Sequence, residues 1–149
     1  LQEYDEQRTG SILYNIAQFA SFGQDVRNSS MYKLCHEMGE TIRQIAMRGP
    51  AVFIGRCSTE VLRENGRTVR AYIYCSEGKK RLERVMRTEQ VTETEAKRLM
   101  EKKDRQRMDY FKFLTGRKWE DRANYDLEIN TSAFSPENCA RILLQAMEM

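Results

Sequence analysis

Apolar side chains recur at helical spacing in the first third of the chain. In residues 11–22, and again in residues 30–48, they lie three or four positions apart, which predicts an amphipathic helix in each segment. The second helix is expected to end at Gly49 and Pro50, because this pair is a typical helix-stop signal.

Short apolar or alternating runs predict three strands. Residues 51–55, Ala-Val-Phe-Ile-Gly, form a continuous apolar run bounded by turn residues, as is typical of a strand buried on both faces. Residues 69–75 place alternate apolar side chains on one face and predict a second strand. A third strand is expected at residues 126–130.

Helix-start signals separate and follow these strands. Residues 58–65 open with Ser-Thr-Glu, and Ser76 is expected to cap the next helix. Thr92 and Glu95 have the spacing of a capping box, which opens a long charged helix. Ser135, with proline in the following position, is expected to cap the last helix.

The alternation of helices and strands predicts an α/β fold with a parallel sheet and right-handed crossovers. A parallel sheet of only three strands, covered on both faces, is unusually narrow. We therefore expect the sheet of this chain to be incomplete.

The composition narrows the class of protein without identifying a function. A chain of 149 residues with 40% hydrophobic residues suits one domain, and a net charge of +3 gives no field typical of nucleic-acid or membrane-surface binding. The long charged helix that opens at Thr92 also lacks the interleaved aromatic residues of an RNA-binding surface. No apolar run approaches the roughly 20 residues of a membrane span, and no signal peptide opens the chain, so we expect a cytoplasmic protein without membrane or nucleic-acid partners.

Three of the four cysteines lie among apolar neighbours in the sequence, which predicts buried free thiols. The four form no C-x-x-C pair, which argues against a zinc site or a thioredoxin-type motif, and we assign no metal ligand. Cys35 is adjacent to the single histidine, His36, but neighbours in a helix point about 100° apart, which disfavours a Cys-His nucleophile.

Three motifs together resemble a known family. Residues 48–57, Arg-Gly-Pro-Ala-Val-Phe-Ile-Gly-Arg-Cys, resemble the segment in which a buried strand of cytidylate kinase-like proteins delivers a Gly-Arg pair to the active site. Residues 115–119, Thr-Gly-Arg-Lys-Trp, and residues 125–132, Tyr-Asp-Leu-Glu-Ile-Asn-Thr-Ser, are similar to two further signatures of that family. The resemblance runs from about Tyr4 to the end of the chain.

The resemblance implies a three-layer α/β fold with a parallel sheet of the P-loop kinase type. The family's first strand and its glycine-rich phosphate loop have no counterpart in these residues. We therefore expect an N-terminally truncated domain with three of about five strands, whose sheet is completed by upstream residues or by a second copy in a homo-oligomer. The expected parts are an acceptor-side helical lobe at 1–30, core strands and helices at 31–91, a lid region at 92–120, and the last core strand and C-terminal helix at 121–149.

Arg56 is the first candidate for binding the acceptor. It follows residues 51–55 directly, and ligands of open parallel sheets lie at the carboxyl ends of strands. The resemblance assigns its guanidinium to the acceptor phosphate, and an ion pair with a carboxylate such as Glu60 is the alternative. Cytidylate kinases have an aspartate where this chain has Cys57. They also use an arginine on the helix that corresponds to residues 30–48, and Lys33 is the nearest cation to that position here. The identity of the acceptor therefore stays open.

Charged residues of the long helix resemble a kinase lid. Arg105 and Arg107 resemble the lid arginines of nucleoside monophosphate kinases, which stabilise the charge of the transferred phosphoryl group, and Asp104 is expected to orient them. The alternative is a solvated helix face on which Glu101 and Arg105 form an i,i+4 pair. Arg117 is expected to be a further phosphate donor.

The loop after the last predicted strand is the candidate for binding ATP. In related kinases this loop lies against the adenine, so the resemblance implies that Thr131 and Ser132 contact the nucleotide. A plain capping turn is the alternative.

These residues predict a phosphotransferase that moves the γ-phosphoryl group of ATP, with Mg2+, to a small-molecule nucleotide such as a nucleoside monophosphate. By itself the chain is expected to be inactive, because the phosphate loop would lie upstream. The alternative is a non-catalytic nucleotide-binding or regulatory module on the same fold, which Cys57 favours.

Overall fold

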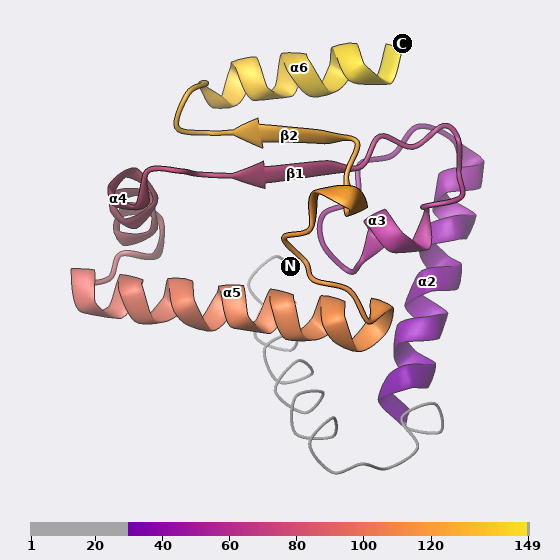
Figure 1. Ribbon diagram of the computed structural model, residues 1–149, viewed down its shortest axis with the longest axis horizontal. Helices are drawn as coiled ribbons and strands as arrows, with labels where there is room; N and C mark the ends of the chain where they lie inside the picture. Colours follow the sequence, from indigo (N-terminus) through magenta and orange to yellow (C-terminus); the bar gives the residue numbers. More distant parts are fainter. Residues whose placement is uncertain (1–29, 149) are drawn as a thin grey trace. The chain divides into compact units, whose positions relative to one another are not determined.

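The computed structural model describes residues 30–148. Within this range it is an α/β structure with five α-helices, one 3-10 helix and a small parallel sheet of two strands (Figure 1). The helix predicted at residues 11–22 lies outside the described range. The elements are α2 (Ser30–Arg48), α3 (Ser58–Val61), β1 (Ala71–Tyr74), α4 (Gly78–Glu89), α5 (Glu93–Thr115), η2 (Arg122–Asn124), β2 (Leu127–Asn130) and α6 (Pro136–Glu148).

The chain divides into two compact units. Among the described residues, the first comprises 30–64 together with 106–119, and the second comprises 65–105 together with 120–148. α5 therefore begins in the second unit and ends in the first.

The first unit contains α2, α3 and the last part of α5. The helix predicted at 30–48 is confirmed as α2, which buries Cys35 and Ile42 and ends where Gly49 takes a left-handed φ of 156°. Leu62, after α3, and Phe111, of α5, are also buried. These side chains form the apolar core of the unit.

The second unit is built on the pairing of β1 with β2. The strands are parallel, with Ala71 opposite Leu127, and Figure 1 shows both arrows pointing the same way. At the entry to the sheet, the carboxylate of Asp126 accepts from the backbone N–H and the Nε of Arg70, both at 2.9 Å. This charge-assisted contact stabilises the register where the strands begin, and Ile129 of β2 is buried in the core.

Residues 51–55, predicted to be a buried strand, do not form one. Val52 and Ile54 are 84% and 91% exposed, and no strand is assigned at this position. A strand requires a hydrogen-bonded neighbour, and within residues 30–148 the sheet consists of β1 and β2 alone. The described chain therefore contains two of the three predicted strands.

Two helix-start predictions are confirmed. The backbone N–H of Thr92 donates to the Glu95 carboxylate at 3.0 Å, and the N–H of Glu95 donates to the Thr92 hydroxyl at 3.4 Å, which completes the capping box of α5. The N–H of Asn138 donates to the Ser135 hydroxyl at 3.3 Å at the start of α6. In both cases side chains satisfy backbone donors that have no partner within the helix.

Two other boundary predictions are wrong. The helix predicted at 58–65 is the single turn α3, because the backbone leaves the helical range at Leu62, with φ −103° and ψ 15°. Ser76 does not cap α4, whose N-cap position is Glu77. The Ser76 hydroxyl instead accepts from the Asn130 amide at 2.8 Å, so a contact between distant segments replaces the local one.

The capping box yields a stability prediction. Thr92→Ala should lower the free energy of unfolding by about 1 kcal/mol, because it removes the acceptor for the N–H of Glu95. Chemical denaturation monitored by circular dichroism measures this change. Thr88→Ala is the matched control, because the Thr88 hydroxyl donates to two carbonyls within α4 and caps no backbone N–H. Equal stability of the two variants would contradict the capping role.

Candidate functional site

Three consecutive residues before α3 have left-handed backbone. The φ angles are 72° at Gly55, 57° at Arg56 and 52° at Cys57, and the Ser58 N–H donates to the Gly55 carbonyl at 3.0 Å. Such a backbone costs a residue with a side chain roughly 1–2 kcal/mol. Strained residues of this kind cluster at functional sites. The turn therefore supports a functional role for the half-buried Arg56.

Two buried thiols, Cys57 and Cys35, and the half-buried phenol of Tyr110 interact next to this turn. Burial, with smaller contributions from Cys35 and Glu60, raises the pKa of Cys57 to about 12. Burial also raises the pKa of Cys35, against a hydrogen bond with Tyr110 that lowers it, and raises the pKa of Tyr110 above its usual range. The charge of Arg56 acts on Tyr110 in the opposite direction. Both thiols are therefore protonated at neutral pH and offer no nucleophile.

The cysteine prediction is confirmed for the described chain. All four thiols are free, and three of them are buried, while Cys75 is half-buried. At the position where the resemblance expects an aspartate, Cys57 offers a buried, neutral thiol. It supplies no carboxylate for the hydroxyl groups of a sugar.

Glu60 of α3 connects the turn to the segment after α5. Its Oε2 accepts from Arg117 Nη1 at 3.0 Å and from Arg63 Nε at 3.0 Å. The backbone at Arg117 is placed by Gly116, which has a φ of 70°, and by a hydrogen bond from the Arg117 N–H to the Thr115 hydroxyl at 3.0 Å. Glu60 thus holds an arginine that the sequence predicted to bind phosphate.

The predicted lid arginines have different surroundings. Arg105 is exposed on α5. The Arg107 guanidinium lies over the ring of Trp119, 6.0 Å from its centroid, within range of a cation–π interaction. Trp119 therefore lies against a predicted lid residue. No ion pair between Glu101 and Arg105 occurs in the described structure.

Asp104 forms a bidentate ion pair that the sequence analysis missed. Its two carboxylate oxygens accept from Arg81 of α4 at 2.6 and 2.7 Å, and both side chains are 28% exposed. Two parallel hydrogen bonds of this kind also fix orientation. The pair anchors the first half of α5 to α4. Arg81 had no local signal in the sequence, because its partner is 23 positions away.

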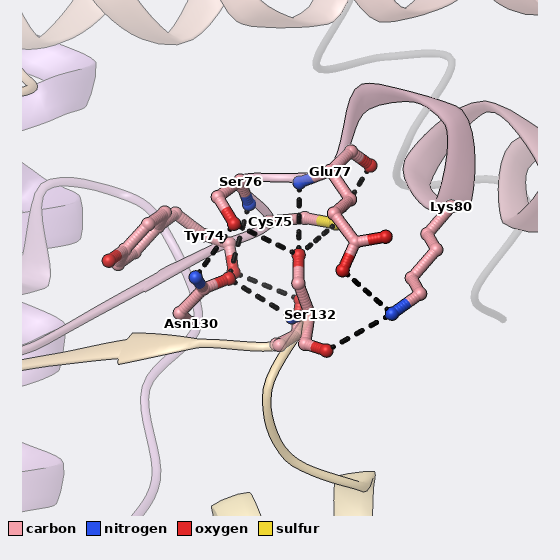
Figure 2. A network of polar contacts seen from close by, with 8 residues as sticks. Tyr74, Cys75, Ser76, Glu77, Lys80, Asn130 and Ser132 are labelled. Atoms are coloured by element: carbon pink, nitrogen blue, oxygen red, sulfur yellow. Dashed lines mark hydrogen bonds and ion pairs between the residues drawn. The ribbon is translucent and has the colours of Figure 1, made fainter.

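The carboxyl ends of β1 and β2 are joined by a polar network (Figure 2). Asn130 Oδ1 accepts from the N–H groups of Ser76 and Ser132 at 3.1 and 3.0 Å. The N–H and the hydroxyl of Thr131 both donate to the Tyr74 carbonyl, at 2.7 and 2.9 Å. These contacts close two loops onto each other at the sheet edge where α/β proteins bind ligands.

Ser132 connects the same network to α4. Its Oγ accepts from the Glu77 N–H at 3.0 Å, and its carbonyl accepts from Lys80 Nζ at 3.3 Å (Figure 2). Hydrogen bonding to Glu77, at 2.7 Å, raises the pKa of Lys80. Burial raises the pKa of Cys75, but hydrogen bonds with Ser132 and Glu77 outweigh it, so that its pKa lies below the usual value.

The hydroxyls of Thr131 and Ser132 are both engaged within the protein. This arrangement agrees with the capping-turn alternative, and their contact with ATP stays a prediction. Asn130 lies within residues 125–132, one of the three family signatures, but was not predicted as a site residue. In an Asx turn, an asparagine side chain accepts from the backbone N–H two positions further along the chain, so this contact was open to prediction from Asn130 itself.

The predicted site residues belong to two units. The first unit contains Arg56, Arg107, Arg117 and the exposed Lys33 of α2, and the second contains Asp104, Arg105, Thr131 and Ser132. Across the described residues, no group of three His, Cys, Asp or Glu side chains is placed to hold a metal ion. Among the described helices, none is both long and apolar enough to cross a membrane.

Two comparisons give matches. The model of the cytidylate kinase-like family matches residues 1–133 of this chain. Among solved structures, the crystal structure of an uncharacterized protein from Eubacterium ventriosum ATCC 27560 is similar, with a TM-score of 0.75 and 25% sequence identity. That similarity covers 83% of this chain and 70% of the other. No curated protein matches.

The family match covers the left-handed turn, the arginines of α5 and the loop after β2. It bears out the resemblance that the three sequence motifs carry. The chain belongs to the cytidylate kinase-like family.

Proposed function

We propose that this chain forms part of an ATP-dependent phosphotransferase whose acceptor is a nucleoside monophosphate or a similar small phosphate compound. Family membership indicates a kinase-like role. The observation that carries the proposal further is the left-handed backbone at Arg56 and Cys57. Two adjacent non-glycine residues keep this unfavourable conformation where the family resemblance expects the acceptor-binding arginine, as strain retained for function would.

Arg56 binds the acceptor in this proposal. A guanidinium can clamp a phosphate with two parallel hydrogen bonds, which an ammonium cannot do. Lys33 supplies a second positive charge from α2 of the same unit. Because Cys57 is buried and neutral, specificity for the sugar of the acceptor has to come from other residues.

Arg105, Arg107 and Arg117 act on the transferred group. During transfer, an acceptor oxygen bonds to the γ-phosphorus, the bond from that phosphorus to the β–γ bridging oxygen breaks, and ADP leaves with the electron pair. Negative charge spreads over the equatorial oxygens, where guanidinium donors stabilise it. Asp104 contributes by position, because its ion pair with Arg81 orients the part of α5 that carries Arg105.

ATP and Mg2+ are the implied cofactors. The loop containing Thr131 and Ser132 is proposed to face the adenine, chiefly through its backbone, because both hydroxyls have partners within the protein. We assign no described residue to Mg2+, which proteins commonly bind through the phosphates of the nucleotide with few side-chain ligands. The proposal also includes the cytoplasmic location and a lid formed by residues 92–120.

A second candidate is a non-catalytic nucleotide-binding or regulatory module. The buried thiol of Cys57 favours it, because a carboxylate expected for acceptor recognition is absent. Nucleotide binding without phosphoryl transfer would distinguish this candidate from the enzyme.

The first test of the proposal measures phosphoryl transfer. The complete gene product, assayed with Mg-ATP and a panel of nucleoside monophosphates, should release ADP in an acceptor-dependent manner. Arg105→Ala should lower kcat about 100-fold, as the loss of one donor to the transition state typically does. The melting temperature should not change, because Arg105 is exposed.

Lys102→Ala is the matched control, because Lys102 is another exposed cation of α5. It should retain activity. Full activity of Arg105→Ala would show that Arg105 does not act on the transferred group. Absence of ADP release across the whole panel of acceptors would contradict the proposal of an enzyme.

The second test uses the strain at Arg56. Arg56→Gly should raise the free energy of unfolding by about 1 kcal/mol, because glycine adopts the left-handed conformation without steric cost. The same variant should raise the KM for the acceptor at least tenfold and leave the KM for ATP unchanged. Denaturant titration and steady-state kinetics measure the two effects, and lower stability with an unchanged acceptor KM would indicate a purely structural arginine.

A further inference from the structure

One carboxylate oxygen of Glu60 accepts hydrogen bonds from two arginines that lie in different segments of the chain. Arg63 lies one helical turn further along the chain, whereas Arg117 comes from the segment after α5, 57 positions away. Both nitrogen–oxygen distances are 3.0 Å. The exposed fractions of the side chains are 27% for Glu60, 27% for Arg63 and 40% for Arg117.

The backbone of Arg117 is fixed more firmly than its side chain. Gly116 and the hydrogen bond to the Thr115 hydroxyl set the position of its backbone. Among residues 30–148, Glu60 is the hydrogen-bond partner of its guanidinium, through a single nitrogen. A single, partly exposed contact of this kind is worth only a fraction of a bidentate pair. The guanidinium can therefore exchange Glu60 for a more highly charged anion while its backbone stays in place.

We propose that Glu60 is a positioning residue that holds Arg117 in a resting position and releases it to the transferred phosphoryl group, while Arg63 remains on the carboxylate. This inference rests on the proposed function and adds Glu60 and Arg63 to the residues that control it.

Arg63 determines how much the release costs. If Arg117 were the only partner, its departure would leave a partly buried carboxylate unpaired, which is unfavourable. With Arg63 still bound, the carboxylate keeps one guanidinium, so the release needs less free energy. The double contact thus makes Arg117 available to the substrate and keeps α3 stable.

The two substitutions next to Arg117 should therefore have opposite effects. Glu60→Gln removes the charge that competes with the phosphoryl group and should raise kcat/KM for ATP about two- to fivefold, the range expected for a partly exposed ion pair. Arg63→Gln removes the second guanidinium from Glu60, which strengthens the pairing of Glu60 with Arg117, and should lower kcat/KM by a similar factor. A structural role for the cluster would lower kcat/KM in both variants.

The experiment measures steady-state kinetics with Mg-ATP for the complete gene product and these two variants, each also combined with Arg117→Gln. In the Arg117→Gln background, neither substitution should change kcat/KM further, because the arginine that they control is gone. Glu40→Gln is the matched control, because Glu40 forms an i,i+3 pair with Arg43 on α2 and should leave kcat/KM unchanged.

The failures of the two proposals are distinguishable. An active protein in which Glu60→Gln and Arg63→Gln shift kcat/KM in the same direction, or not at all, overturns the release of Arg117 and leaves the phosphotransferase intact. The release of Arg117 is also overturned if Glu60→Gln and Arg63→Gln still shift kcat/KM in opposite directions in the Arg117→Gln background. A protein that neither binds nor turns over ATP, measured by calorimetry and ADP release, overturns the proposed function and this inference with it.

Discussion

The left-handed turn at residues 55–57 is the constraint on which the candidate site depends. Three consecutive positive φ angles reverse the chain between the exposed apolar segment and α3, and only the first falls on a glycine. The turn sets where Arg56 emerges and where α3 begins, and it therefore also sets the position of Glu60. Glu60 in turn holds Arg117. One strained local conformation thus relates the proposed acceptor-binding arginine to an arginine proposed to act on the transferred group.

The burial of Cys57 fits the same constraint. Its thiol lies in the apolar core of the first unit, where burial raises its pKa to about 12, and its backbone keeps the left-handed conformation. A carboxylate with the same burial would lose far more solvation free energy than a thiol. A neutral residue therefore suits this turn as it is folded here, and the proposed function leaves recognition of the acceptor's sugar to other residues.

Features that depend on neighbours in the sequence were predicted well. The apolar periodicity of α2, the capping box at Thr92 and the cap at Ser135 each involve residues within a few positions, so the sequence contains all the information for them. The predicted strand at 51–55 depends on a partner strand, and without one among the described residues the same apolar side chains are exposed. Apolar composition alone does not determine whether a segment pairs.

The candidate site residues were chosen by residue type, and their contacts were not predicted. The family motifs pointed to Arg56 and Arg117, and the resemblance to lid arginines of nucleoside monophosphate kinases pointed to Arg105 and Arg107, because guanidinium groups suit phosphate. The carboxylates that hold such arginines could not be found in this way. Arg81 and Asp104 are separated by 23 positions, and Glu60 and Arg117 by 57, so no local spacing relates them. Only the fold brings these charges together.

The two units stabilise their candidate sites by different means. At the ends of β1 and β2, most contacts join neutral groups, and several hydrogen bonds converge on Asn130 and Ser132, which fixes the relative position of the two loops. Around Glu60, the contacts join charged, partly exposed groups, which water and substrate anions can replace at low cost. A loop that receives a nucleotide base benefits from a fixed shape, whereas an arginine that follows a migrating phosphoryl group has to change partners. The distribution of neutral and charged contacts therefore matches the roles proposed for Ser132 and Arg117.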